Sequence, residues 1–343
     1  MLPWKMEVLG LSSILERERY MSGSTNVASY VGICLVSLVM LFTAGCASEQ
    51  QAVDFYVDAV VLKGQNEPEK AVQKLNLSLQ ANKHFSLAYS LLGEIYQEKN
   101  DYEKSAASYE KATEINPWSF TDYYNLGRVY QIMKKFTQAV KAYTKACELK
   151  PQHLEAHIGA AESYYEIKDY NEALVYGQRA EQIDPNTRNV QKLLGNIYDS
   201  QKDYEQSIRS YKRALELDSN NPEIMASLAV AYLRTNRNEP AKELLKSVIQ
   251  LQPNNSSAYQ YLGYCYLELK EMDKAIESYS RAIEINDKDW ESQKGLGVAY
   301  AFASGNDKTL KAKAVEHWRL SLQIKSDQPN RERLLKYIRA YSK

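Results

Sequence analysis

Few residues of this sequence have the type and spacing that catalysis or metal binding needs. His153 and His157 stand four apart, which is the spacing of two metal ligands on one helix, but no cysteine lies near them and H-E-x-x-H is absent. The sequence also lacks the G-x-S-x-G, G-x-x-x-x-G-K-[ST] and G-x-G-x-x-G patterns of hydrolases and nucleotide-binding proteins. Carboxylates are plentiful but follow helix surfaces, where they meet solvent. We therefore expect no enzyme, no metal site, no cofactor and no small-molecule substrate.

The four cysteines do not form a disulfide framework. They stand at positions 34, 46, 147 and 265, and no C-x-x-C pair occurs. Cys147 and Cys265 fall at helix positions of distant segments. We expect both to be small, buried, hydrophobic side chains.

Cys46 is the one residue whose surroundings point to covalent chemistry. It follows Tyr30–Ala44, an apolar and uncharged run that is shorter than the about 20 residues a transmembrane helix needs and that suits a signal peptide. Small residues at Ala44 and Gly45 would let a peptidase reach the bond before Cys46, and a thiol is needed to accept a diacylglyceryl group. The segment resembles a bacterial lipobox, although Thr43 stands where leucine is usual.

The lipobox resemblance implies a signal peptide over residues 1–45, lipidation of Cys46 and a short linker over 46–51. It implies a protein held by lipid at a bacterial cell envelope, on the outer membrane or in the periplasm of a Gram-negative cell. The alternative is an apolar run that stays uncleaved as a membrane anchor.

The elements that follow are copies of one unit, seen most clearly in Ser256–Asp289. Tyr259, Leu262 and Tyr266 fall on one face of a first helix. Ala275, Tyr279 and Ala282 repeat that spacing on a second helix, after a short polar turn. Gly263 and Ala275 are small enough for the two helix backbones to approach closely. One such hairpin cannot bury its apolar face alone, but stacked neighbours can.

The unit recurs every 34 residues from Ala52 to Asp289 without a gap, which makes seven copies. The small residue of the first helix recurs as Ala59, Gly93, Gly127, Ala161, Gly195, Ala229, Gly263 and Gly297. The pattern resembles the tetratricopeptide repeat (TPR), W-x2-L-G-x2-Y followed by Ala, aromatic and Ala. The resemblance implies an all-α fold, a right-handed superhelical solenoid of about eight helix hairpins.

An eighth copy begins at Trp290 but has five more residues than the pattern between Tyr300 and Ala314. We expect the extra residues to form a lengthened turn at 304–308. Residues 52–328 are thus expected to form the solenoid, and 329–343 a capping helix.

Charge excludes one large class of partner. Lys and Arg number 43 and Asp and Glu also number 43, so no basic excess favours nucleic acid.

By resemblance, a TPR solenoid holds a partner peptide or helix in a concave groove lined by the first helix of each hairpin. The groove positions predicted here are Tyr124, Arg128, Glu162, Tyr165, Lys192, Asn196, Val230, Leu233, Tyr264, Leu267, Val298 and Phe302. The earlier positions are acidic with interspersed tyrosine, and the last three repeats are apolar. We expect the apolar section to take an apolar or amphipathic segment, and aspartate at both Leu233 and Leu267 to abolish binding without unfolding.

These features predict a membrane-anchored scaffold or adaptor that binds protein partners. Its resemblance to envelope TPR lipoproteins suggests help in assembling a pilus, secretion or polysaccharide-export complex. Two alternatives stay open: an uncleaved single-pass TPR scaffold, and the TPR portion of an enzyme complex.

Overall fold

The computed structural model describes residues 47–342, all of whose regular elements are helices. The predicted leader, residues 1–45, and the predicted lipidation site Cys46 lie outside the described residues. Within residues 47–342, no helix combines the length and apolar character needed to cross a bilayer. The chain divides into two compact units between Trp118 and Ser119.

The first unit holds two helix hairpins. Its helices are residues 47–64, α4 (Pro68–Ala81), α5 (Ser86–Glu98) and α6 (Tyr102–Ile115). Ala59, Leu75 and Ile95 lie in its core and are fully buried.

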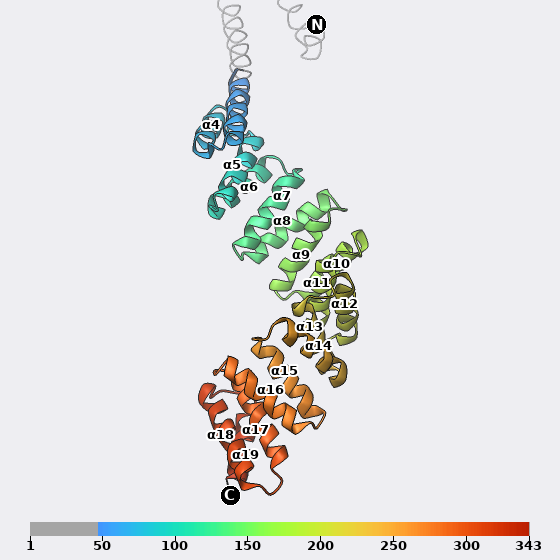
Figure 1. The fold of residues 1–343 in the computed structure, drawn as a ribbon. Helices are drawn as coiled ribbons and strands as arrows, with labels where there is room; N and C mark the ends of the chain where they lie inside the picture. Colours follow the sequence, from blue (N-terminus) through green and yellow to red (C-terminus); the bar gives the residue numbers. More distant parts are fainter. Residues whose placement is uncertain (1–46, 343) are drawn as a thin grey trace, which may run out of the picture. The chain divides into compact units, whose positions relative to one another are not determined.

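The second unit continues the same pattern as antiparallel helix pairs closed by a last helix (Figure 1). Its helices are α7 (Phe120–Ile132), α8 (Phe136–Leu149), α9 (Leu154–Glu166), α10 (Tyr170–Ile183), α11 (Arg188–Ser200), α12 (Tyr204–Leu217), α13 (Pro222–Arg234), α14 (Asn238–Leu251), α15 (Ser256–Glu268), α16 (Met272–Ile285), α17 (Trp290–Ser304), α18 (Lys308–Ile324) and α19 (Arg331–Tyr341). The first helix of each pair is called helix A below, and the second helix B. The predicted all-α repeat solenoid is confirmed.

Helix A and helix B are joined by a three-residue turn whose middle residue is left-handed. These middle residues recur every 34 positions with φ between 57° and 64°: Asn66, Asn100, Lys134, Lys168, Lys202, Asn236 and Lys270. The amide of the next residue donates to a carbonyl of the last turn of helix A, as Glu271 N does to Tyr266 O at 2.9 Å. This closure satisfies a carbonyl that the helix end would otherwise leave free.

Close approach of helix A and helix B is confirmed at the predicted small residues. The Ser207 hydroxyl donates to the Gly195 carbonyl at 3.0 Å, so one helix touches the backbone of the other. The main reason for the glycines is nonetheless an aromatic ring. A Cβ built at Gly263 would lie 2.9 Å from the ring of Tyr279, closer than real contacts allow.

This pairing of sizes holds in every hairpin. Where helix A has glycine, helix B has a large aromatic residue sixteen positions later: Gly93 with Tyr109, Gly127 with Tyr143, Gly195 with Tyr211, and Gly263 with Tyr279. In the last hairpin Gly297 faces Trp318. Where helix A has alanine, helix B has no ring: Ala59 with Leu75, Ala161 with Gly177, and Ala229 with Leu245.

The expected lengthened turn at residues 304–308 is wrong. α17 has 15 residues and α18 has 17, compared with 13 in α15 and 14 in α16. The extra residues therefore extend the two helices, and the turn keeps three residues, Gly305 to Asp307. Asp307 caps α18 by accepting from the amides of Thr309 at 2.7 Å and Leu310 at 3.3 Å, which fixes where the longer helix begins.

The two described cysteines are free and buried, as expected. Burial raises the pKa of the Cys147 and Cys265 thiols to about 12, so both stay protonated and unreactive at neutral pH.

A candidate partner-binding groove

An apolar hollow of about 560 Å³ lies along three successive A helices of the second unit. α13 contributes Val230 and Leu233, α15 contributes Tyr264 and Leu267, and α17 contributes Val298. These positions lie beside the core face of each helix, so stacking of the hairpins leaves most of them accessible. The five residues, with Phe302, are called the C-terminal groove below.

The groove residues differ in exposure. Tyr264 is 38 % exposed and Phe302 is 68 % exposed, while Val230, Leu267 and Val298 are half-buried. Leu233 is only 8 % exposed and packs in the core of the unit. The expectation that Leu233→Asp would spare the fold is therefore wrong, because a carboxylate there would be buried without a partner.

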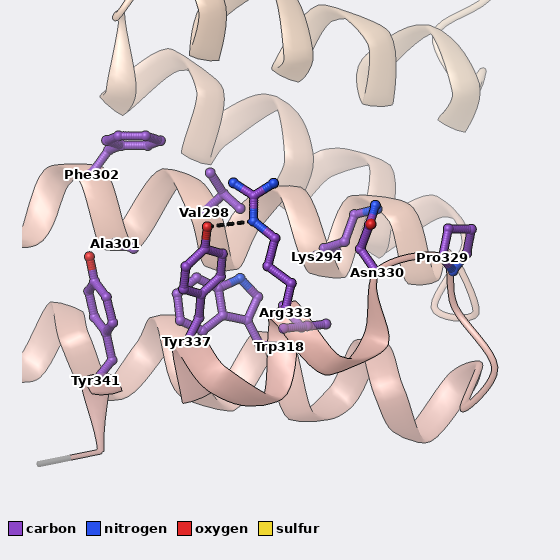
Figure 2. A pocket seen from close by; sticks show the side chains of 11 residues that line it. Lys294, Val298, Ala301, Phe302, Trp318, Pro329, Asn330, Arg333, Tyr337 and Tyr341 are labelled. Atoms are coloured by element: carbon purple, nitrogen blue, oxygen red, sulfur yellow. Dashed lines mark hydrogen bonds between the residues drawn. The ribbon is translucent and has the colours of Figure 1, made fainter. Parts of the chain in front are cut away.

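A second hollow, of about 440 Å³, lies between α17 and the last helix (Figure 2). We call it the α19 cleft. Val298 and Phe302 line it from α17, and Trp318 from α18. It shares Lys294 and Val298 with the first hollow, so the two adjoin. All six apolar positions predicted from sequence thus line one continuous surface.

The predicted acidic section forms a separate hollow of about 390 Å³ along α7, α9 and α11. Glu162, Tyr165, Lys192 and Asn196 line it. A hydrogen-bond chain supports its wall: the Tyr143 hydroxyl donates to Gln131 Oε1 at 2.7 Å, and Gln131 Nε2 donates to Glu162 Oε2 at 2.7 Å. Burial raises the pKa of Tyr143, which keeps its hydroxyl a donor.

The remaining predicted residues, Tyr124 and Arg128, line none of these three hollows. Both lie on α7, where the Arg128 guanidinium sits 5.9 Å from the centre of the Tyr124 ring. Tyr124 also stacks on Phe120 at 5.7 Å and contacts His153 at 5.0 Å. They form a local aromatic cluster beside the acidic section.

One cation of the acidic hollow and one of the first apolar hollow are paired with carboxylates on neighbouring helices. Lys192 pairs with Glu223 at 2.6 Å. Arg234, which lines the first hollow, pairs with Asp199 at 3.4 Å and lies over the Tyr204 ring at 5.5 Å. Burial raises the pKa of Asp199, and Arg234 partly opposes that shift.

Reasoning from repeat positions missed the residues that α19 adds. Arg333, Tyr337 and Tyr341 stand four apart along α19 and all line the cleft. The capping helix is expected from its sequence to close the stack through one face of Leu334, Leu335, Ile338 and Tyr341. Leu334 and Ile338 are indeed buried, whereas Tyr341 lines the cleft. The i, i+4, i+8 spacing of the three larger residues was the available signal of a second face.

The two spaced histidines have structural roles. His153 Nδ1 accepts from the Ala156 amide at 3.2 Å and caps α9, while His157 Nε2 lies 3.1 Å from the Pro151 carbonyl. Within residues 47–342, no cluster of three or more metal-ligating side chains occurs.

The family model for the cilia and flagella-associated protein 70 C-terminal domain, a TPR domain, matches residues 47–296. The chain belongs to this TPR family. The matched residues, 47–296, include the first unit and most hairpins of the second. No curated protein sequence matches the chain.

Solved TPR structures share the fold at low identity. YrrB, a TPR protein with an unusual peptide-binding site, is 19 % identical and covers 60 % of this chain and 100 % of its own, with a TM-score of 0.50. PilF of Pseudomonas aeruginosa is 22 % identical over 61 % of this chain and 95 % of its own, also at 0.50. A chain of the Cut9–Hcn1 assembly is 18 % identical and covers 79 % of this chain and 52 % of its own, with a TM-score of 0.52.

Proposed function

We propose that this protein is a non-catalytic scaffold that holds a segment of a partner protein in the C-terminal groove. The observation that carries the proposal is the continuity of the two apolar hollows through Lys294 and Val298. TPR proteins generally mediate protein–protein interactions, and YrrB is described as having a peptide-binding site. Binding a partner segment requires a continuous, accessible apolar surface, made here by helix A positions that the core packing does not need.

A photoreactive residue placed in the groove tests this proposal. Full-length protein with p-benzoyl-phenylalanine at Tyr264 or at Phe302 is expressed in the cells that naturally make it and irradiated. We expect one or more discrete crosslinked proteins at both positions. The matched control is Val175 on α10, a residue 58 % exposed that lies outside the groove. Crosslinks at Val175 alone, or the same products at all three positions, would contradict groove binding.

A groove variant then tests whether the captured contact depends on apolar side chains. We expect Tyr264→Asp with Phe302→Asp to weaken partner binding by roughly tenfold or more. Val175→Asp should leave binding unchanged. Circular dichroism of both variants should match that of the wild type, because all three side chains are exposed.

We further propose that a lipid on Cys46 anchors this scaffold at a bacterial envelope, where it assists assembly of an envelope complex. The apolar run followed by Ala44-Gly45-Cys46 supports the anchor. Labelled palmitate should enter the wild type and not Cys46→Ala, and the mature wild-type chain should lack residues 1–45. An unlabelled chain with its first residues intact would instead establish an uncleaved anchor.

A further inference from the structure

The α19 cleft has an aromatic end and a cationic end (Figure 2). Phe302, Tyr337 and Tyr341 line the aromatic end, and the buried ring of Trp318 lies beside Tyr337. Trp318 packs edge-on against Tyr341 at 5.4 Å and lies 5.9 Å from Tyr337, so these rings are held in place. Such a surface suits an aliphatic or aromatic side chain.

Arg333 and Lys294 supply the cationic end. Arg333 Nε donates to the Tyr337 hydroxyl at 2.7 Å, which leaves the two terminal nitrogens of the guanidinium turned into the cleft (Figure 2). Lys294 Nζ lies 4.8 Å from the centre of the Trp290 ring. Within residues 47–342, neither cation forms an ion pair, whereas Arg234 of the adjoining hollow pairs with Asp199.

Two cations without ion-pair partners, beside an apolar wall, suit a ligand that carries both a carboxylate and an apolar group. A carboxylate would pair with the guanidinium in the two-pronged geometry that arginine favours. An adjacent apolar side chain would fill the aromatic end. Because the cleft adjoins the C-terminal groove, an extended segment held in that groove can reach into the cleft.

We propose that the α19 cleft selects partner segments in which an aspartate or glutamate stands within a few residues of a large apolar side chain. This inference rests on the proposed function and names the chemistry of the partner. Arg333 and Lys294 read the carboxylate, and the rings around Trp318 hold the apolar side chain.

A displayed library of random 16-residue peptides tests the selection. Full-length protein in detergent is immobilised as wild type, as Lys294→Gln with Arg333→Gln, and as Lys336→Gln with Arg339→Gln. The last variant is the matched control, because it loses the same charge from exposed positions of α19 that do not line the cleft. We expect acidic residues next to Leu, Ile, Phe or Trp to be enriched with the wild type and the control. The Lys294/Arg333 variant should keep the apolar preference and lose the acidic one.

Affinities of one selected peptide complete the test. Replacing its acidic residue by the matching amide should weaken binding to the wild type by about tenfold, and should have little effect on the Lys294/Arg333 variant. Peptides that require Tyr264 and Phe302 but show no acidic preference would overturn the inference and leave the proposed function standing. Peptides that bind equally well to Tyr264→Asp with Phe302→Asp, or no selected peptides at all, would count against both.

Discussion

At the scale of single residues, the packing of every hairpin but one is a match between one small and one large side chain, the exception being Ala161 with Gly177. Tyr279 illustrates it, because its ring lies against Gly263 of its own hairpin and Gly295 of the next. Tyr143 lies in the same way against Gly127 and Gly159. The ring fills the space beside a glycine of helix A, where a side chain would otherwise lie. Whether a methyl group can be added at that glycine therefore depends on which residue helix B places against it.

We therefore expect Gly263→Ala to lower the free energy of unfolding by about 1–3 kcal/mol, although alanine favours a helix more than glycine does. The added Cβ would lie 2.9 Å from the Tyr279 ring, which is itself held against Gly295 and cannot retreat. Chemical denaturation followed by circular dichroism measures the change. An unchanged or raised stability would show that the hairpin adjusts freely.

Gly177→Ala is the matched substitution with the opposite expectation. The nearest atom to its new Cβ would be Leu194 Cδ2 at 3.0 Å, a methyl group that can rotate away. Stability should stay constant or rise by up to about 1 kcal/mol. Tyr279→Leu combined with Gly263→Ala gives this hairpin the same pair of residues as Ala229 and Leu245 of the sixth repeat. In a protein that already carries Tyr279→Leu, Gly263→Ala should therefore lower the free energy of unfolding by less than about 0.5 kcal/mol.

Sequence reasoning at this scale predicted the apolar residues that line the two adjoining hollows, but not how deeply each one is buried. Val230, Tyr264, Leu267, Val298 and Phe302 were placed on an accessible surface because their repeat positions lie off the core phase. Leu233 has the repeat position of Leu267, yet it is buried while Leu267 is half-buried. Burial depends on which neighbours surround a position, and a repeat pattern does not encode them.

At the scale of elements, the 34-residue register predicted where the helices would lie, and the structure confirms it from α5 to α16. The register could not predict the fate of the five extra residues. The extra segment contains Thr309, Lys311 and Ala312, which can lie in a helix or in a loop. Asp307 caps the longer helix where it begins, at Lys308. The second face of α19 also escaped prediction, because a helix at the end of a stack has no repeat to compare it with.

The turns between helix A and helix B contain a further feature that the pattern does not suggest. Lys168 and Lys202 adopt a left-handed backbone with φ of 64°, which costs an ordinary residue about 1 kcal/mol or more. Asn66, Asn100 and Asn236 hold the same place in other repeats, and asparagine tolerates this conformation better.

We expect Lys168→Asn with Lys202→Asn to stabilise the protein, by roughly 0.5 kcal/mol for each turn. The thermal midpoint should rise. Lys141→Asn within α8 provides the control, because the same substitution inside a helix should lower the midpoint slightly. A fall in the midpoint of the double variant would show that these lysines contribute contacts worth more than the backbone strain.

At the scale of the whole molecule, stability depends on buried ionisable groups as well as on apolar packing. Burial lowers the pKa of His157 and of His317. His317 lies beside Gln293, with Nδ1 2.8 Å from Oε1, and stacks on Tyr300. Both imidazoles are thus held neutral in the folded state at pH values where the unfolded chain begins to take up protons.

The consequence is a loss of stability on mild acidification. As pH falls through the ordinary histidine pKa of about 6.5, the unfolded state binds protons that the folded state does not, so the free energy of unfolding falls. Hydrogen bonds lower the pKa of Asp184, through Thr187 and the Asn186 amide, and that of Asp218, through Asn221 and Arg188, and the stability that these bonds contribute is lost only at lower pH. We therefore expect the thermal midpoint to drop between pH 7.5 and pH 5.5.

His157→Gln with His317→Gln should reduce this drop, as differential scanning fluorimetry at the two pH values would show. His84→Gln, which changes an exposed ring, should keep the pH dependence of the wild type. A drop of the same size in the double variant would assign the effect to other groups.

The matched sizes of helix A and helix B also determine which parts of this chain could be exchanged. A whole hairpin carries both members of its pair, whether glycine–ring, alanine–leucine or the Ala161–Gly177 pair of the fourth repeat, so duplicating or transplanting it leaves that pair intact. Moving only helix A of the sixth repeat into the seventh would set Ala229 against Tyr279, and the converse would leave a space beside Leu245. The unit of rearrangement is therefore the hairpin, with one condition: a hairpin that carries Tyr143 or Tyr279 must be followed by one with glycine at the position of Gly159 or Gly295.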